Sequence, residues 1–307
     1  MRLTVAICTY NRAELLRQTL AGLARQTLPA DAYEVLVIDN NSTDHTAAVV
    51  AEFAHANPAP RRIQESTQGL EHARNRAIAE ARGEIILFGD DDILVESTWL
   101  TEILAPFDAD TAQRIGALGG EVIPVFPDGL PPWVAEWHSP LRFRTDAGPL
   151  TPQQSPMGAN LAFRRAVFAQ VGVFAIGLGR NGKNLFAGDE TEMLRRVRAA
   201  GLEIWFAPAA AVRHQMPASR TTFRYACRHG FDSARSRVIE RVGLHHSTGY
   251  LATRLVANVL KLLLFLVLAA LNALVFRLGG CKQSLVRAWR SCGYLYQISR
   301  LLVGKTV

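Results

Sequence analysis

The sequence predicts an α/β fold with a mostly parallel central sheet, followed by a helical C-terminal tail. In the first half of the chain, short aliphatic runs alternate with segments whose apolar residues recur at helical spacing. The run EIILFGD at 84–90 is continuously apolar up to its polar end. Strands that are buried on both faces show such runs, because helices cover both faces of a parallel sheet.

The charge distribution divides the chain near residue 215. Residues 1–215 carry 20 Lys and Arg against 25 Asp and Glu, whereas residues 216–307 carry 14 Lys and Arg against two acids. The net charge of +7 is therefore a property of the tail, and we expect two regions, 1–215 and 216–307. A basic tail can bind nucleic acid or an anionic membrane surface. Because an apolar run lies inside this tail, we expect it to bind a membrane and not nucleic acid.

Three strands are expected in the first 90 residues, and each ends in a polar segment. The strand runs are LTVAIC, YEVLVIDN and EIILFGD, at 3–8, 33–40 and 84–90. Helical patterns follow at 13–26, 42–56 and 69–83. Because ligands of such sheets gather at the carboxyl ends of strands, we expect CTYNR, DNNSTD and GDDD to meet at one edge.

The pattern weakens after residue 118 and then recovers. A Pro-rich stretch at 127–156, which contains Trp133 and Trp137, is typical of a long loop or lid; the two indoles suit packing, or stacking on a sugar ring. A glycine-rich basic loop, GLGRNGKN, covers 177–184. The remaining predicted elements are a strand at 119–126, strand then helix at 157–172, a helix at 188–201 and a strand at 202–208.

Three consecutive carboxylates, Asp90, Asp91 and Asp92, follow the apolar strand at 84–90. One interpretation is a solvated turn between strand and loop. The other is a cation site, because Mg²⁺ and Mn²⁺ prefer carboxylate oxygens and are often completed by substrate phosphates. A cation between these side chains would relieve the repulsion among them.

Seven motifs resemble, in order, those of family 2 glycosyltransferases of the GT-A fold, of the bacterial type that builds exopolysaccharide or O-antigen. They are VAICTYNR, VLVIDNNSTDHT, GLEHARNRAI, ILFGDDD, MGANLAFRR, GDETEMLRR and VRH. The resemblance covers about two thirds of the chain, residues 3–215. It implies a Rossmann-like GT-A sandwich and an inverting enzyme. Such an enzyme transfers a sugar from a nucleotide-diphosphate sugar to a hydroxyl of a glycan, with Mn²⁺ or Mg²⁺.

The resemblance also implies a set of residues at the nucleotide-sugar donor. Asp39 matches the acid that hydrogen-bonds the base, although it could also cap its own turn. Arg74 matches a residue near the diphosphate, although it could be a solvated helix residue. Asp91 is the variable middle position of the DxD motif. The predicted donor site comprises Thr9, Tyr10, Asn11, Arg12, Asp39, Arg74, Asn75, Asp90, Asp91, Gly158 and Asn160.

Metal ligands and a general base follow from the same resemblance. Asp92 matches the residue that ligates the metal, and Asp90 matches the residue that faces ribose and metal. His214 matches a C-terminal histidine that reaches the metal or diphosphate. The alternative for His214 is an exposed side chain without such a role. Glu190 is the expected base, with Asp189 beside it. The family commonly has Glu-Asp here, so the reversed order leaves both acids as candidates. A base must accept the proton of the attacking hydroxyl, and the metal stabilises the departing diphosphate.

The tail holds the apolar segment 251–276, followed by a basic, aromatic segment at 283–302. Its uninterrupted core, 262–276, contains only Asn272 as a polar residue and is shorter than the roughly 20 residues of a membrane span. Arg254, Asn258 and Lys261 join Asn272 on one helical face. Four basic residues lie on each side of the segment, so charge gives no orientation.

We therefore expect a re-entrant or interfacial helix pair at the cytoplasmic face of the bacterial inner membrane, which fits a lipid-linked acceptor. A single span and a soluble dimerisation helix are the alternatives. For the whole chain the rivals are a GT-A-like nucleotidyltransferase, which typically begins with a Gly-rich phosphate loop, and a non-catalytic membrane scaffold. The segment CTYNRAE lacks that loop, and the chain retains the acids that a scaffold would be expected to lose.

Overall fold

The computed structural model describes residues 1–307 other than 138–139, 183, 243–247 and 304–307. The chain forms two compact units. Unit 1 comprises Met1–Val125, Pro140–Ala175 and Glu190–Gln215, and unit 2 comprises Phe126–Ser139, Ile176–Asp189 and Met216–Val307. Two segments of the first 215 residues therefore belong to the same unit as the tail.

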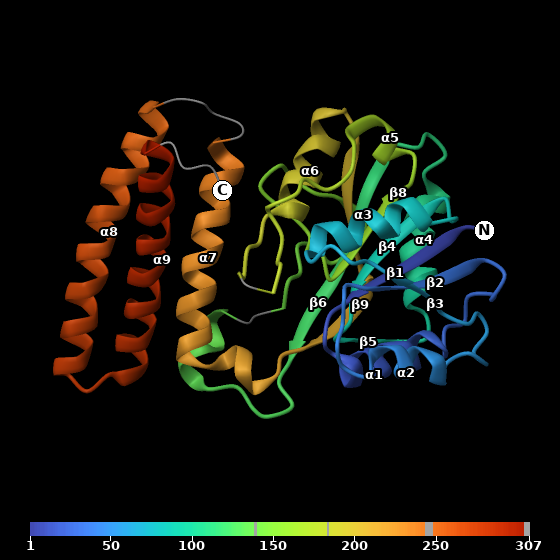
Figure 1. Ribbon diagram of the computed structural model, residues 1–307. Helices are drawn as coiled ribbons and strands as arrows, with labels where there is room; N and C mark the ends of the chain where they lie inside the picture. The colour runs from blue at the N-terminus through green and yellow to red at the C-terminus, as the bar shows by residue number, and fades with distance from the viewer. Residues whose placement is uncertain (138–139, 183, 243–247, 304–307) are drawn as a thin grey trace. The chain divides into compact units, whose positions relative to one another are not determined.

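Unit 1 is built on a mixed sheet with the order β3-β2-β1-β4-β8-β6-β9-β5, and β7 pairs with β9 (Figure 1). The pairs β3/β2, β2/β1, β1/β4 and β6/β9 are parallel, and β8 runs antiparallel to both of its neighbours. The strands are β1 Leu3–Thr9, β2 Tyr33–Asp39, β3 Arg61–Gln64, β4 Ile85–Asp90, β5 Ile93–Val95, β6 Ile115–Val125, β7 Gly148–Pro149, β8 Asn160–Arg164 and β9 Glu203–Gln215.

Helices cover both faces of this sheet, as the continuous apolar strands predict. On one face, Val5 and Ile7 share a core with Leu16 and Leu20 of α1. On the other face, Ala6 shares a core with the small residues of α3. The described helices of unit 1 are α1 Ala13–Leu23, α2 Thr46–Glu52, α3 Leu70–Glu80, α4 Trp99–Ala109, α5 Val167–Val171 and α6 Asp189–Ala199.

Several predicted boundaries were wrong, and each error has a local cause. The helix expected from Ser42 begins only at Thr46, because residues 42–44 form a turn that bonds Asn11 and Asp39. The strand predicted to end at residue 208 continues to Gln215. A shift in the register between this strand, β9, and β6 accommodates the Ala-Pro segment, so the strand does not end there. The strands β3, β5 and β7, the helices α4 and α7 and the short turn η2 were not predicted.

In the part of unit 2 that the structure describes, there are three long helices, α7 Phe223–Val242, α8 Thr248–Leu274 and α9 Leu278–Leu302, and the short turns η1 Pro132–Trp137 and η2 Ala218–Thr221. Helix α9 packs against both α7 and α8. The first part of the Pro-rich stretch, within Phe126–Ser139, belongs to this unit: Gln283 donates to the Trp133 carbonyl oxygen at 2.9 Å, and Lys282 lies over the Trp133 ring. Trp133 therefore packs within unit 2, and the side chain of Trp137 lies outside the described residues.

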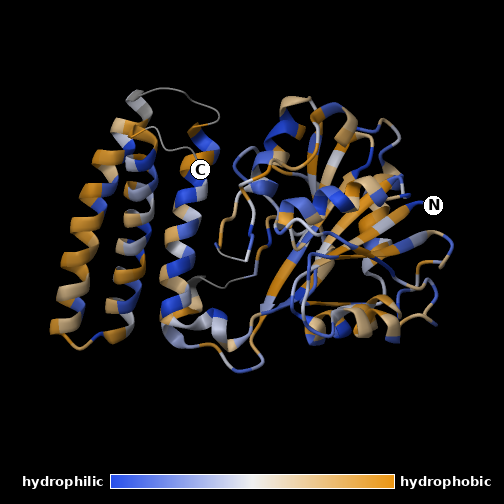
Figure 2. Cartoon of the chain, in the orientation of Figure 1, coloured by the Kyte–Doolittle hydropathy of each residue, from blue (hydrophilic) through white to orange (hydrophobic). Residues whose placement is uncertain are grey.

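The predicted polar stripe of helix α8 is divided between the interior and the surface. Asn258 is buried and Asn272 is half-buried near Gly280 of α9, and each donates to the backbone of its own helix, whereas Arg254 and Lys261 are exposed. Most of its large aliphatic residues are exposed as well. Figure 2 shows the predominantly hydrophobic colour of α8. Leu251–Leu274 is the described segment long and apolar enough to cross a membrane, with a mean hydropathy of 2.2 and 11% of its window buried.

Candidate active site

The carboxyl ends of β1, β2 and β4 meet at one edge of the sheet, as predicted. In the strand register, Thr9 lies beside Asp39, and Cys8 lies beside Asp90. The turn after β1 is tied to the turn after β2, because the Asn11 side-chain oxygen accepts from the Thr43 backbone N–H at 2.7 Å. Asn11 has a φ of 52°, and the Tyr10 side chain is exposed beside it.

Asp39 is buried at this edge and has two kinds of partner. Its Oδ1 accepts from the Ser42 backbone N–H at 2.9 Å, which is the turn-capping role. Its Oδ2 accepts from Arg62 at 2.9 and 2.6 Å. Arg62 lies on β3, a strand that was not predicted, so no local pattern marked this arginine as a partner of Asp39.

The three consecutive acids are not equivalent. Asp91 is 3% exposed and accepts from the Thr9 hydroxyl at 2.8 Å and from Arg12 at 2.6 Å. Burial raises the pKa of Asp91, and the positive charge of Arg12 opposes that rise. Arg12 also lies 3.0 Å from Asp92. Thr9, Arg12 and Asp91 thus hold the acidic turn together, a structural role that the sequence does not reveal.

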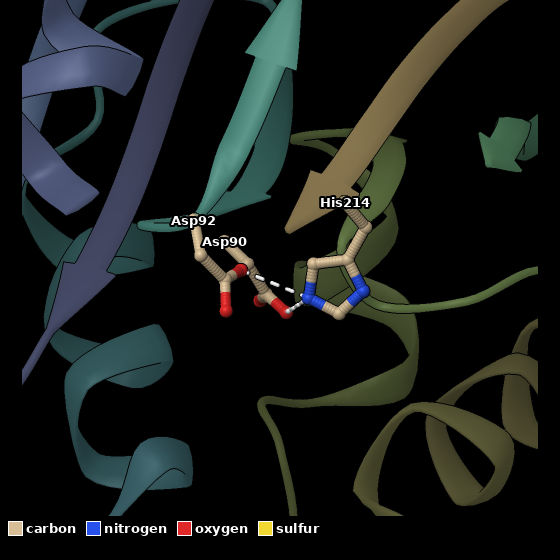
Figure 3. Close-up of side chains that lie close together, drawn as sticks. All are labelled: Asp90, Asp92 and His214. Carbon is tan, nitrogen blue, oxygen red and sulfur yellow. Dashed lines mark ion pairs between the residues drawn. The ribbon is translucent and has the colours of Figure 1, made fainter. Parts of the chain in front are cut away.

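Asp90 and Asp92 face His214, which comes from the far end of the unit-1 sequence (Figure 3). His214 Nε2 lies 2.9 Å from Asp92 Oδ1 and 3.7 Å from Asp90 Oδ2. The pairing of β5 with β9 sets this approach, since Ile93 lies opposite His214 and the Gln215 N–H donates to the Asp92 carbonyl oxygen at 2.9 Å. Asp92 is fully buried, whereas the Asp90 side chain is 35% exposed.

These three side chains fit a divalent cation. Each offers one ligand atom, and the three atoms lie within 4.8 Å of one another. Two carboxylate oxygens and an imidazole nitrogen suit Mn²⁺, and carboxylates with open positions for phosphate oxygens suit Mg²⁺. The exposure of Asp90 leaves one side of the cluster open to solvent, where a ligand can approach.

A second group of predicted residues gathers around Arg74. The Arg74 guanidinium lies over the Phe174 ring at 5.3 Å, and its Nη1 is 3.9 Å from Glu190 Oε2. A Cβ on Gly158 would lie 2.4 Å from Arg74 Nη2, so a side chain at this position would displace the guanidinium. Asn75 fixes the same corner by exchanging two hydrogen bonds of 2.9 Å with the Phe174 backbone.

The two candidate bases differ in burial. The Asp189 residue is 2% exposed, whereas the Glu190 side chain is 21% exposed. Both lie in the first turn of α6, where the helix dipole favours an anion. A base must reach an acceptor hydroxyl, so the more accessible Glu190 is better placed than Asp189.

Asn160 belongs to the framework beneath the site. It is fully buried, its amide nitrogen donates to the backbone oxygens of Glu121 at 3.2 Å and Ala210 at 2.7 Å, and its oxygen accepts from Trp99 Nε1 at 3.2 Å. These bonds join β8 to β6, β9 and α4. The side-chain oxygen and nitrogen of Asn160 therefore already have partners within the protein. Its direct contact with the donor sugar stays a prediction.

Comparison with known proteins identifies the family to which the chain belongs. The family model for glycosyl transferase family 2 matches residues 4–172. Glycosyltransferase AglE of Haloferax volcanii is 28% identical over 66% of the chain, and the match spans 64% of that protein's length. Succinoglycan biosynthesis protein ExoM of Rhizobium meliloti is 27% identical over 77% of the chain and 74% of its own length.

Solved structures share the fold. The mannosyltransferase PcManGT of Pyrobaculum calidifontis, in complex with GDP-Man and Mn²⁺, has a TM-score of 0.64 at 22% identity and covers 96% of this chain and 86% of its own. TarS 1-349 of S. aureus, in complex with UDP, has a TM-score of 0.55 at 19% identity, over 99% and 92% of the two chains. With the family match over more than half of its length, the chain belongs to glycosyl transferase family 2 and is a glycosyltransferase of the GT-A fold.

Proposed function

We propose that this enzyme is an inverting, divalent-metal-dependent glycosyltransferase of cell-surface polysaccharide synthesis. It moves a sugar from a nucleotide-diphosphate sugar to a hydroxyl of a lipid-linked glycan. The observation that carries the proposal is the Asp90, Asp92 and His214 cluster at the carboxyl edge of the sheet. PcManGT and TarS, which share the fold, have been solved with GDP-Man and Mn²⁺ and with UDP.

The donor would bind along the edge formed by β1, β2 and β4. Asp39 and Arg62 would meet the nucleotide base, and the exposed Tyr10 would lie against it. Asp90, Asp92 and His214 would hold Mn²⁺ or Mg²⁺, which when bound neutralises charge on the departing diphosphate. Arg74, buried beside Gly158, would add a fixed positive charge near that diphosphate.

Glu190 would accept the proton of the acceptor hydroxyl as that oxygen attacks the anomeric carbon. The Arg74 guanidinium, 3.9 Å from this carboxylate, would help to hold it in position. One base and one leaving group on opposite sides of the sugar imply a single displacement, and therefore inversion of the anomeric configuration.

Membrane residence is proposed from unit 2. Helix α8 buries Asn258, half-buries Asn272 and exposes most of its large aliphatic residues, an arrangement suited to lipid rather than to water. We place the α8–α9 pair in the cytoplasmic face of the bacterial inner membrane, where a lipid-linked acceptor is at hand. Truncation at about residue 245 should move the protein to the soluble fraction; retention of the truncated chain on membranes would refute the anchoring role.

The proposed reaction is tested by incubating the full chain with UDP- and GDP-sugars, Mn²⁺ and a membrane lipid extract, and measuring the released nucleoside diphosphate. Glu190→Gln should retain donor binding and lose transfer by about a hundredfold or more, because a positioned base contributes about 10²–10⁴-fold. The matched control is Glu96→Gln, which changes an exposed acid. Substantial turnover by Glu190→Gln would assign the base to Asp189 or another group.

A further inference from the structure

The segment that precedes the candidate bases is held by helix α7. Residues 185–188 lead directly into Asp189, the first residue of α6, and Glu190 follows it. The segment Ile176–Asp189 belongs to the same compact unit as α7, so the contacts between them lie within one unit. These contacts connect the candidate bases to a helix that has no part in the reaction described above.

Two side chains of α7, four residues apart, bond the backbone of this segment. The Asp232 carboxylate accepts from the Leu185 backbone N–H at 3.0 Å. The Ser236 hydroxyl donates to the Ala187 carbonyl oxygen at 2.9 Å and accepts from the Ala187 backbone N–H at 3.3 Å. Because residues four apart share one face of a helix, the segment runs along a single face of α7.

Burial makes these bonds hard to replace. Asp232 is 5% exposed and Ser236 is fully buried, so water has little access to the backbone groups that they bond. A buried N–H or carbonyl group that loses its partner bears the full cost of its desolvation. The conformation of residues 185–188 therefore depends on the side chains that α7 supplies.

Arg235 braces the same contact from a third side. Its guanidinium lies over the ring of Phe186, which is 4% exposed, and over the ring of Tyr296 on α9, at 5.0 and 5.1 Å. It also lies 3.2 Å from Asp232 Oδ1 and donates to the side-chain oxygen of Gln297 at 3.3 Å. The Asp232 carboxylate is thus oriented, with one oxygen toward Arg235 and the other toward the segment.

We propose that Asp232 and Ser236 are positioning residues for the catalytic base. They fix the backbone of residues 185–188 and, through it, the start of α6. The inference rests on the proposed function, in which Glu190 or Asp189 accepts the proton of the acceptor hydroxyl. A base must lie within about 2.6–3.2 Å of that hydroxyl, and a displacement of about 1 Å can cost about a hundredfold in rate.

The first test measures amide hydrogen exchange of the full chain, without nucleotide. Ser236→Ala removes the hydroxyl that bonds Ala187, and we expect exchange in residues 185–190 to be faster by about tenfold or more, with the rest of the chain unchanged. Ser233→Ala is the matched control, because the Ser233 hydroxyl donates to the Gly230 carbonyl oxygen of its own helix, at 3.2 Å. It should leave exchange in residues 185–190 as in the wild type.

The second test measures transfer, as released nucleoside diphosphate. Ser236→Ala should lower kcat by about tenfold or more and leave the KM of the donor and the Mn²⁺-dependent binding of UDP or GDP within about twofold of the wild type. Added to Glu190→Gln, the same substitution should cost no further activity, because a residue that acts through the base has no effect once the base is gone. A residue that only stabilised the fold would lower kcat by the same factor in both backgrounds. If Glu190→Gln keeps its turnover, Asp189→Asn takes its place in this comparison.

A second pair of variants tests the bond to Leu185. Asp232→Asn keeps an acceptor oxygen for the Leu185 N–H, whereas Asp232→Ala has none, so kcat should be higher in the Asn variant. Equal kcat in the two variants would contradict a positioning role for this bond. Circular dichroism checks that each variant is folded.

Two results would overturn the proposal as a whole. One is equal exchange of residues 185–190 in Ser236→Ala and Ser233→Ala. The other is an equal loss of kcat on adding Ser236→Ala to the wild type and to the base variant. Failure of the proposed reaction is recognised separately, as a wild type that releases no nucleoside diphosphate from UDP- or GDP-sugars. The exchange measurement would still decide whether α7 holds the segment.

Discussion

The substitution Asp92→Asn separates the metal role of the acidic turn from its structural role. Asp92 is fully buried, 3.0 Å from Arg12 and 2.9 Å from His214, and Asp90 and Asp91 lie beside it. In the metal-free protein, loss of the charge removes attraction to Arg12 but also removes repulsion from the neighbouring acids and the burial cost of a carboxylate. These opposing effects should keep the free energy of unfolding within about 2 kcal/mol of the wild type.

With metal the two proteins should differ clearly. At free Mn²⁺ of about 100 times Kd, binding stabilises the native state by about 2.7 kcal/mol, or about 5–10 °C in Tm. Asp92 offers one of the three ligand atoms of the candidate metal site, and the substitution removes its negative charge, so we expect the variant to bind Mn²⁺ about 100-fold more weakly. The same Mn²⁺ concentration then stabilises the variant by only about 0.4 kcal/mol, or about 1 °C.

The assay is a thermal-unfolding series over Mn²⁺ concentration, with and without UDP and GDP. Asp31→Asn is the matched control, because Asp31 is an exposed acid outside the site. The control should show the full Mn²⁺-dependent rise in Tm. If Asp92→Asn shows the same rise, Asp92 is not a metal ligand, and the geometry of the Asp90, Asp92 and His214 cluster has been misinterpreted.

Two further predictions concern stability. Asn160→Ala should lower the free energy of unfolding by about 3 kcal/mol, because three buried hydrogen bonds contribute roughly 1 kcal/mol each; urea denaturation measures this, and a change below about 1 kcal/mol would contradict the framework role. Burial lowers the pKa of His229 to about 4, so the unfolded chain binds more protons than the native protein between about pH 6.5 and 4. The stability that depends on neutral His229 is therefore complete above about pH 6.5 and lost as the pH falls toward 4. His229→Gln should lack this part of the pH dependence, and identical profiles for variant and wild type would contradict it.

Much of the fold could be predicted because its signals are local. Continuous apolar runs marked β1, β2 and β4, and helical spacing marked α1, α3 and α6. Elements that lack such a signal were missed: β3 reads RRIQ, with a single apolar residue, and β5 has only three residues. Both are defined by the strands they pair with, and no pattern within so short a segment indicates that pairing.

The sequence by itself determined that polar segments would follow three parallel strands and meet at one edge, since strand order and direction fix where carboxyl ends lie. The sequence also contains the candidate acids of the site and the motifs that resemble those of the family. Only the tertiary structure decided what each side chain does. The register of β9 against β5 brings His214 to Asp92 across more than 100 residues, and the close approach of Thr9 and Arg12 turns Asp91 into a structural acid. Such long-range contacts depend on packing between segments far apart in the chain, and local periodicity carries no record of them.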